Sequence, residues 1–137
     1  MKNMAWIDTG FLVALFAYND THHQSACQFL EKSQQLELHC ILPVIVEACF
    51  FLDNTGKQAL LQWIELDAVV IHEVKKRDLP AIRKVLKTYH NINPDFTDAT
   101  LVALADLHNI NKILTVDKRD FSIYRLSNGE CFERLWN

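Results

Sequence analysis

The chain has 137 residues, half of them apolar, which is enough for a single domain, 1–137, with a sizeable core. Its net charge of −3 argues against a protein that binds nucleic acids through overall charge alone. No apolar run approaches the ~18 residues of a membrane span, and the apolar N-terminal stretch lacks the charged leader and cleavage site of a signal peptide. We therefore expect a cytoplasmic protein that does not associate with membranes.

Charge is unevenly distributed along the chain. Residues 1–74 carry 3 basic and 9 acidic groups, a net −6, whereas residues 75–137 carry 11 and 8, a net +3. Acids gathered around a cation would leave the remaining surface more basic than the total suggests. The four cysteines form no CxxC pair and have no zinc-like spacing, which predicts reduced thiols in or near the core. They are Cys27, Cys40, Cys49 and Cys131.

The N-terminal half is predicted to contain one short buried strand followed by four helices. The strand is "MAWI", and Pro43 fits the first turn of the third helix, where its missing N–H is not needed. Gly56 is expected to end that region before the fourth helix begins. The strand is placed at 4–7 and the helices at 10–16, 21–34, 43–52 and 57–66.

The C-terminal half alternates between strand and helix patterns. "AVVIHEV" and "KILTV" are typical of buried strands, and the tail around Asn128-Gly129 of a terminal strand pair or hairpin. "LPAIRKVLKTY" is an amphipathic helix, and "TDATLVALADLH" is apolar nearly all round and therefore central. Strands separated by helices predict an α/β domain with a mainly parallel sheet and right-handed crossovers.

Four acids stand in apolar surroundings. Asp8 and Asp117 follow predicted strands, so both should point into the crevice at the carboxyl ends of a parallel sheet. Glu47 and Asp98 interrupt apolar helices. Any one of the aspartates could simply cap a helix, and Asp95 could do so three residues before Asp98. Glu47 is harder to explain in this way, because glutamate is almost never fully buried unless it is paired.

No lysine or arginine lies in the segments that carry Asp8, Glu47 or Asp98. Carboxylates facing one another would repel and raise one another's pKa values, and a divalent cation would remove that cost. Oxygen ligands and the absence of histidine from the four positions favour Mg²⁺ or Mn²⁺ over zinc. The sequence therefore predicts a hard-metal site.

Four segments together resemble the PIN-domain family, most closely the VapC-like bacterial ribonucleases. They are "IDTGFLVALF", the isolated Glu47 on its apolar helix, "DFTDATLVALAD" and "ILTVDKRDFSIYRL". The resemblance extends over essentially the whole chain. It implies a three-layer α/β/α fold and a metal-dependent endoribonuclease, with a homodimer and a partner antitoxin if the protein is a VapC-type toxin.

The resemblance also implies roles for individual residues. The catalytic quartet would be Asp8, Glu47, Asp98 and Asp117. Asp8, Asp98 and Asp117 would hold Mg²⁺ or Mn²⁺, with Glu47 acting through water, on a weaker second ion, or as general base. Asp95 competes with Asp98 as third acid, and Gly10 stands where many relatives have serine. Supporting residues would be Thr9, Thr115, Asp95 and Asp120, and the RNA-binding candidates are Lys118, Arg119 and Arg125.

Other functions remain as alternatives. A phosphoacceptor receiver domain would need adjacent acids after the first strand, and a haloacid-type phosphatase would need an aspartate where Gly10 stands. No glycine-rich phosphate loop is present. A catalytically silent PIN-like RNA-binding or assembly module and a non-toxin RNA-processing nuclease are the alternatives that stay open.

Overall fold

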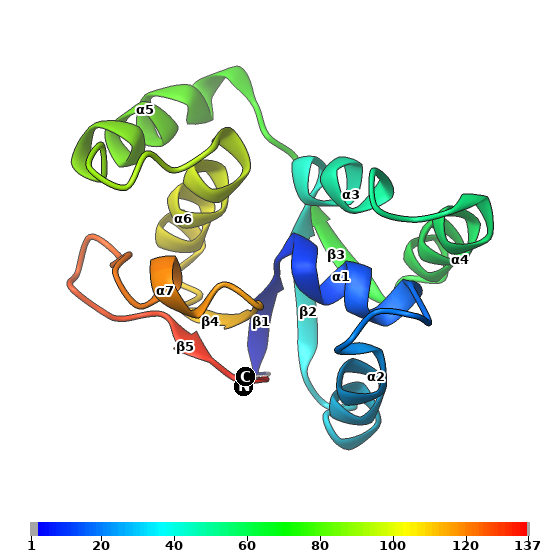
Figure 1. The fold of residues 1–137 in the computed structure, drawn as a ribbon. Coiled ribbons are helices and arrows are strands. Elements are labelled where there is room, and N and C mark those ends of the chain that lie inside the picture. Colours follow the sequence, from blue (N-terminus) through cyan, green and yellow to red (C-terminus); the bar gives the residue numbers. More distant parts are fainter. Residues whose placement is uncertain (1–2, 137) are drawn as a thin grey trace.

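The computed structural model describes residues 3–136 and contains a five-stranded sheet in the order β3-β2-β1-β4-β5 (Figure 1). Every neighbouring pair of strands is parallel. The predicted α/β class with a mainly parallel sheet is therefore confirmed. The strands are β1 (Met4–Ile7), β2 (Glu37–Ile41), β3 (Val69–His72), β4 (Lys112–Leu114) and β5 (Glu133–Arg134).

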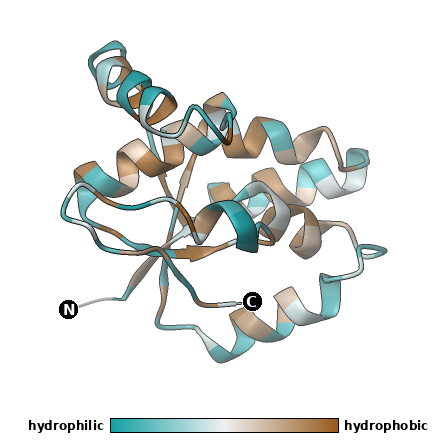
Figure 2. Cartoon of the chain, turned by 60° about the vertical axis from the view of Figure 1, so that its left-hand side comes forward, coloured by the Kyte–Doolittle hydropathy of each residue, from teal (hydrophilic) through white to brown (hydrophobic). Residues whose placement is uncertain are grey.

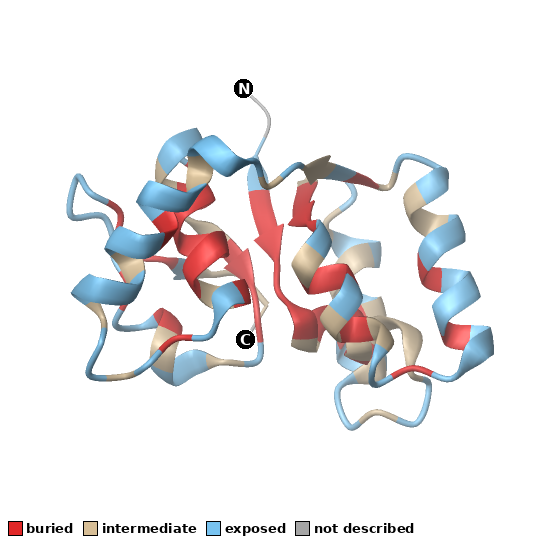
Figure 3. Ribbon diagram, turned by 90° about the horizontal axis from the view of Figure 1, so that it is seen from above, coloured by how far each residue is buried: buried red, intermediate tan, exposed pale blue. Residues whose placement is uncertain are grey.

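Helices cover both faces of this sheet, which gives the three layers that the sequence predicts (Figures 1 and 3). On one side α1 contacts α2, α3 and α4, and on the other α5 packs against α6. The helices are α1 (Thr9–Phe16), α2 (His23–Lys32), α3 (Leu42–Cys49), α4 (Asn54–Glu65), α5 (Leu79–Thr88), α6 (Phe96–His108) and the short α7 (Lys118–Phe121). None of the helices in residues 3–136 is both long and apolar enough to cross a membrane.

The core lies between the sheet and the inner faces of the helices. Figure 3 shows buried residues concentrated in the strands, and Figure 2 shows polar residues alternating with apolar ones along the outer helices. Helix α6 is buried along most of its length, from Thr97 to Ala105, as its apolar composition predicts. All four cysteines are free; Cys40 is buried, but Cys131 is exposed, contrary to the predicted core position.

The order of the strands defines where a ligand would bind. The chain passes from β1 to β2 and β3 on one side and then returns to β4 on the other side of β1. Ligands of open α/β sheets bind at such a switch point, outside the carboxyl ends of the strands. The Asp8 N–H donates to the Leu114 carbonyl (3.0 Å), which closes the sheet at this point.

Strand β2 was missed by the sequence prediction. Its residues Glu37 and His39 point to the same side of the sheet and bond to each other (2.8 Å), so the segment lacks the continuous apolar pattern of a buried parallel strand. The helix α3 that follows directly from β2 carries Glu47. The missed strand is thus the element that positions one of the predicted acids.

Two further expectations were wrong in detail. Gly56 does not end a segment but lies in the first turn of α4, where its N–H donates to the capping Asp53 (2.7 Å). The terminal hairpin is reduced to one antiparallel bridge between Arg125 and Cys131, and β5 instead joins β4 in parallel. The reason is local: the Arg125 guanidinium donates to the carbonyls of residues 122–124 and holds this segment in a turn after α7.

Candidate active site

Asp8 lies at the end of β1 and is 7% exposed. Its Oδ1 accepts the Thr9 N–H (2.8 Å) as the N-cap of α1, and its Oδ2 accepts the Thr115 hydroxyl (2.9 Å). The capping interpretation is therefore correct, but it does not account for the whole side chain. The second oxygen is fixed from the opposite strand, so Asp8 is held at the crevice between β1 and β4.

Asp117 lies on the other side of this crevice. Its Oδ1 accepts the Asp120 N–H (3.0 Å) and caps α7, while its own N–H donates to the Thr115 hydroxyl oxygen (3.0 Å). The Thr115 hydroxyl thus links two acids, since it accepts from the Asp117 backbone and donates to Asp8. Both residues have a local structural role, and both face the same space.

Asp95 and Asp98 take different positions at the start of α6. Asp95 is exposed, and its Oδ1 caps the helix by accepting the Asp98 N–H (2.8 Å). The Asp98 side chain is half-buried and offers an oxygen within 4.8 Å of oxygens of Asp117 and Asp120. Asp98 therefore belongs to a group that could hold a metal ion, whereas Asp95 is the cap.

Glu47 completes the group from α3. Asp8, Glu47, Asp98 and Asp117 all line one cleft of about 430 Å³, together with Asp95 at its rim. Segments almost 110 residues apart in the chain are thus brought together. Asp120, expected only as a supporting acid, lies as close to Asp98 and Asp117 as a metal ligand would.

The geometry raises the pKa values of the buried acids. Burial is the main cause for Asp8, whose pKa rises to about 6 even though the bonds from Thr9 and Thr115 lower it and Glu47 and Asp117 raise it. The pKa of Asp98 rises to about 8 through burial and then through the charges of Asp8, Asp95, Asp117 and Glu47. Each acid is therefore destabilised in its charged form by its surroundings.

The protein supplies no cation of its own to this cleft. Within residues 3–136, no lysine or arginine forms an ion pair with Asp8, Glu47, Asp98 or Asp117. The Asp98 and Glu47 carboxylates accept no hydrogen bond from the described residues, and the buried Thr9 Oγ1 has no partner there. A donor set made only of oxygens fits a hard divalent cation such as Mg²⁺ or Mn²⁺.

Tyr124 is a residue of this site that the sequence did not indicate. Its ring is fully buried, and its hydroxyl has no hydrogen-bond partner among the described residues. Burial raises the pKa of the phenol, and the charges of Asp98 and Asp120 add to the effect. Since "FSIYRL" has only an apolar strand-like pattern, no local signal identifies this hydroxyl as a neighbour of the acids.

The predicted RNA-binding residues lie near one side of the cleft. Lys118 and Arg119 are exposed on α7, directly after Asp117. Arg125 is also exposed, but its Nη1 donates to the carbonyls of residues 122–124. Lys118 and Arg119 are therefore the more available cations, and a role for any of the three in binding RNA stays a prediction.

Gly10, the position where the resemblance leads us to expect serine, is explained by packing. A Cβ atom added there would lie 2.3 Å from Cγ2 of Val116, in the loop between β4 and Asp117. A serine would require Val116 to move, so glycine at one position is matched to valine at the other.

Comparisons with known proteins agree with this architecture. The sequence matches the PIN domain family over residues 5–126. The fold is similar to the crystal structure of VapC20 from Mycobacterium tuberculosis, described as a toxin that cleaves the sarcin–ricin loop, with a TM-score of 0.71 and 21% identity. The match covers 85% of this chain and 92% of VapC20, and a comparison with curated proteins gave no match. The family match spans most of the chain, so the protein belongs to the PIN domain family.

Proposed function

We propose that the protein is a Mg²⁺- or Mn²⁺-dependent endoribonuclease and the toxin of a type II toxin–antitoxin pair. One observation carries the proposal: four acids from distant segments converge on one cleft with no lysine or arginine to neutralise them. Similarly charged groups in a folded protein need a compensating charge, and a divalent cation supplies it.

In this proposal Asp8, Asp98 and Asp117 hold the ion. Thr9 and Thr115 keep the Asp8 carboxylate in place through the bonds described above. When bound, the ion supplies an acidified water and neutralises charge that develops on the phosphodiester. Asp120 lies close enough to contribute a further oxygen.

Glu47 has a different role. It enters the cleft from α3, opposite the α7 side, and it adds to the negative charge around Asp8 and Asp98. A carboxylate there can accept a proton from an attacking water, or it can orient that water through a hydrogen bond. We propose the general-base role for Glu47.

RNA is the proposed substrate, with Lys118 and Arg119 contacting its backbone next to the acids. The structural relative VapC20 is described as cleaving the sarcin–ricin loop, so a ribosomal RNA fragment with this loop is the first substrate to test. A messenger or transfer RNA pool serves as the second substrate, because the similarity to VapC20 concerns the fold alone.

A homodimer and an antitoxin are the proposed partners. Large apolar side chains are exposed beside the acids, and they line a second cleft that also includes Glu47. Among them Phe50 is 81% exposed and Phe96 50% exposed. Exposed apolar patches of this kind are typical of protein interfaces. The residues of this apolar patch are Leu42, Pro43, Val46, Phe50 and Phe96.

The decisive experiment compares wild type with Asp8→Asn. Wild type should cleave RNA in Mg²⁺ or Mn²⁺ and lose this activity in a chelator, and Asp8→Asn should not cleave. Asp53→Asn is the matched control, since Asp53 also caps a helix but lies outside the cleft. Full cleavage by Asp8→Asn would overturn the proposal.

Calorimetry with Mn²⁺ separates the nuclease from a catalytically silent RNA-binding module. Wild type should bind Mn²⁺, and Asp117→Asn should bind it at least tenfold more weakly. If neither protein binds Mn²⁺ while both bind RNA, the silent-module alternative is favoured.

A further inference from the structure

A row of polar side chains lies on the face of the sheet that α6 covers, and none of its members lines the acidic cleft. Glu37 and His39 come from β2, His72 is the last residue of β3, and His108 is the last residue of α6. We call these four residues the histidine row. Trp6 packs against all three imidazoles, with ring centroids 4.8 Å from His72, 5.8 Å from His39 and 6.2 Å from His108.

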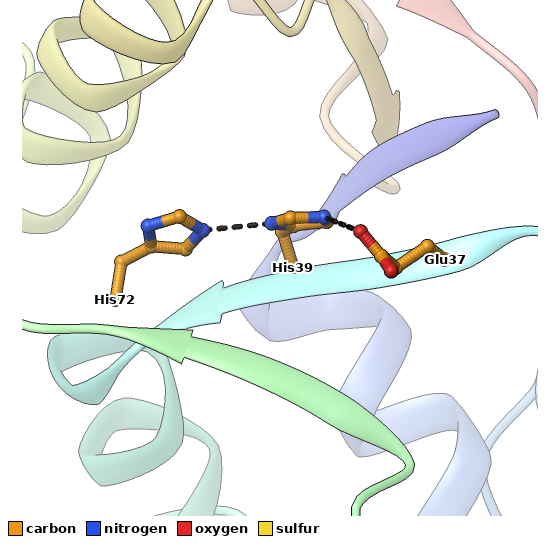
Figure 4. Close-up of polar contacts among 3 residues, drawn as sticks. All are labelled: Glu37, His39 and His72. Carbon is orange, nitrogen blue, oxygen red and sulfur yellow. Dashed lines mark hydrogen bonds and ion pairs between the residues drawn. The ribbon is translucent and has the colours of Figure 1, made fainter. Parts of the chain in front are cut away.

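Hydrogen bonds fix the order of protons along this row (Figure 4). The Glu37 carboxylate is 2.8 Å from His39 Nε2, and His39 Nδ1 is 2.7 Å from His72 Nε2. A carboxylate only accepts, so His39 Nε2 carries a proton. With one proton on each ring, His39 Nδ1 must accept, and the His72 Nε2–H donates to it. The lone pair of His72 is then on Nδ1.

This Nδ1 faces away from His39, toward the side from which His108 approaches (Figure 4). The centroids of the His72 and His108 rings are only 4.4 Å apart, closer than any other pair of rings in the row. Burial, followed by the neighbours His108 and His39, lowers the pKa of His72 to about 4. At neutral pH His72 is therefore an uncharged imidazole with a lone pair directed at a second imidazole.

The space in front of the two rings is open. His72 and His108 line a cleft of about 240 Å³, and the same cleft is lined by the acids Glu73 and Asp78. A carboxylate oxygen for a further coordination position thus lies along the same wall. Lys75 also borders the cleft, 3.6 Å from Glu73.

We propose that His72 and His108 form a second metal site that binds a borderline transition-metal ion, such as Zn²⁺. Imidazole nitrogens suit Zn²⁺, Cu²⁺ and Ni²⁺, whereas Mg²⁺ prefers the oxygens of the acidic cleft. A histidine ligand in proteins usually donates its other N–H to an acceptor that fixes the ring and raises its basicity. In this chain His39, backed by Glu37, is that acceptor for His72.

The site would join the carboxyl end of β3 to the carboxyl end of α6. The opposite end of α6 carries Asp98, so the two metal sites lie at the two ends of one buried helix. A bound ion should therefore stabilise the fold without taking part in the chemistry at the acidic cleft.

The test uses the full chain freed of metal and titrated with Zn²⁺ alone, with binding followed by calorimetry and by the thermal unfolding midpoint. The titrations are made in the Asp117→Asn background, so that weakening of the acidic cleft cannot be mistaken for loss of the new site. We expect one Zn²⁺ per chain and a higher midpoint. His108→Ala should weaken binding at least tenfold and remove the rise in midpoint. His108 is exposed at a helix end, so this variant should fold.

His90→Ala is the matched control, because His90 is also exposed at a helix end and bonds only to the Lys87 carbonyl (3.0 Å). It should bind Zn²⁺ as the background protein does. His39→Gln should weaken binding about 10–100-fold, the usual effect of removing a group that orients a ligand. Equal Zn²⁺ affinity in His108→Ala and in the background protein, or no binding in the background, would overturn the proposal.

Discussion

The acidic cleft and the histidine row are both polar clusters against the same small sheet, but they satisfy their polar atoms in opposite ways. In the row a carboxylate, an N–H and a ring nitrogen alternate, so each contact joins a donor to an acceptor. In the cleft acceptors face acceptors, and the only donors are two backbone N–H groups, the Asp98 N–H aside, and the Thr115 hydroxyl. A cluster that satisfies itself can be stable alone, whereas a cluster of one sign depends on an added charge.

The largest expected effect separates the two clusters by activity. Asp8→Asn should lower metal-dependent RNA cleavage at least about 100-fold, in the range found when one group that stabilises a transition state is removed. The same change should raise the thermal midpoint of the metal-free protein, since one repelling charge is gone. Cleavage assays and differential scanning calorimetry on the same preparation check both effects. A variant that loses activity because it unfolds would contradict this interpretation.

The second prediction concerns pH. Because the pKa values of Asp8 and Asp98 are raised to about 6 and about 8, the folded metal-free protein binds more protons than the unfolded chain between about pH 4 and pH 8. Stability should therefore be highest at the acidic end of this range and fall as pH rises through the two folded values. The shift of Asp8 alone corresponds to about 3 kcal/mol.

Urea unfolding at a series of pH values measures this slope. Saturating Mn²⁺ should remove most of it at neutral pH, because the ion stabilises the charged carboxylates. Asp98→Asn should flatten the slope above pH 6 without any metal. A metal-free protein whose stability rises from pH 5 to pH 8 would show that the acids are compensated within the chain.

The third prediction breaks the histidine row instead. His39→Ala leaves the Glu37 carboxylate and His72 Nε2 without their shared partner in a largely buried position. Loss of a buried hydrogen-bond partner costs about 1–3 kcal/mol, so the free energy of unfolding should fall by this amount. RNA cleavage at 25 °C should stay within about twofold of wild type, since the row does not line the acidic cleft. A loss of cleavage comparable to that of Asp8→Asn would show that the two clusters are coupled.

The smallest expected effect tests the assignment of Asp95 as a cap. Asp95→Ala removes the bond to the Asp98 N–H and should cost about 1 kcal/mol of stability, typical of an N-cap. Cleavage should fall much less than in Asp98→Ala, and Asp95→Ser should recover stability because serine also caps helices. If Asp95→Ala is as inactive as Asp98→Ala, the third acid has been misassigned.

The acids of the cleft were predictable because each stands out locally. Asp8 and Glu47 are charged residues within apolar segments, and Asp98 opens the most apolar helix of the chain. Most helices and the strands β1, β3 and β4 follow from periodicity for the same reason. Asp120 illustrates the limit, since its closeness to Asp98 depends on where the short helix α7 turns after β4.

The histidine row could not be predicted in this way. It exists because the register pairs Ile41 with His72 and Trp6 with His39, which brings together residues 33 positions apart in the case of His39 and His72. No local pattern encodes that register, and β2 itself was not recognised. Tyr124 is similar, because its hydroxyl reaches the acids only after the chain has folded around them.

The bridging hydroxyl of Thr115 has a consequence for how the cleft responds to its occupant. This one oxygen uses its proton on Asp8 and its lone pair on the Asp117 backbone, so the two acids are spaced by the width of a single atom. A displacement of either loop is therefore passed directly to the other, and the cleft behaves as a calliper of fixed opening. Such a rigid gauge favours cations of one ionic radius and discriminates against larger ones.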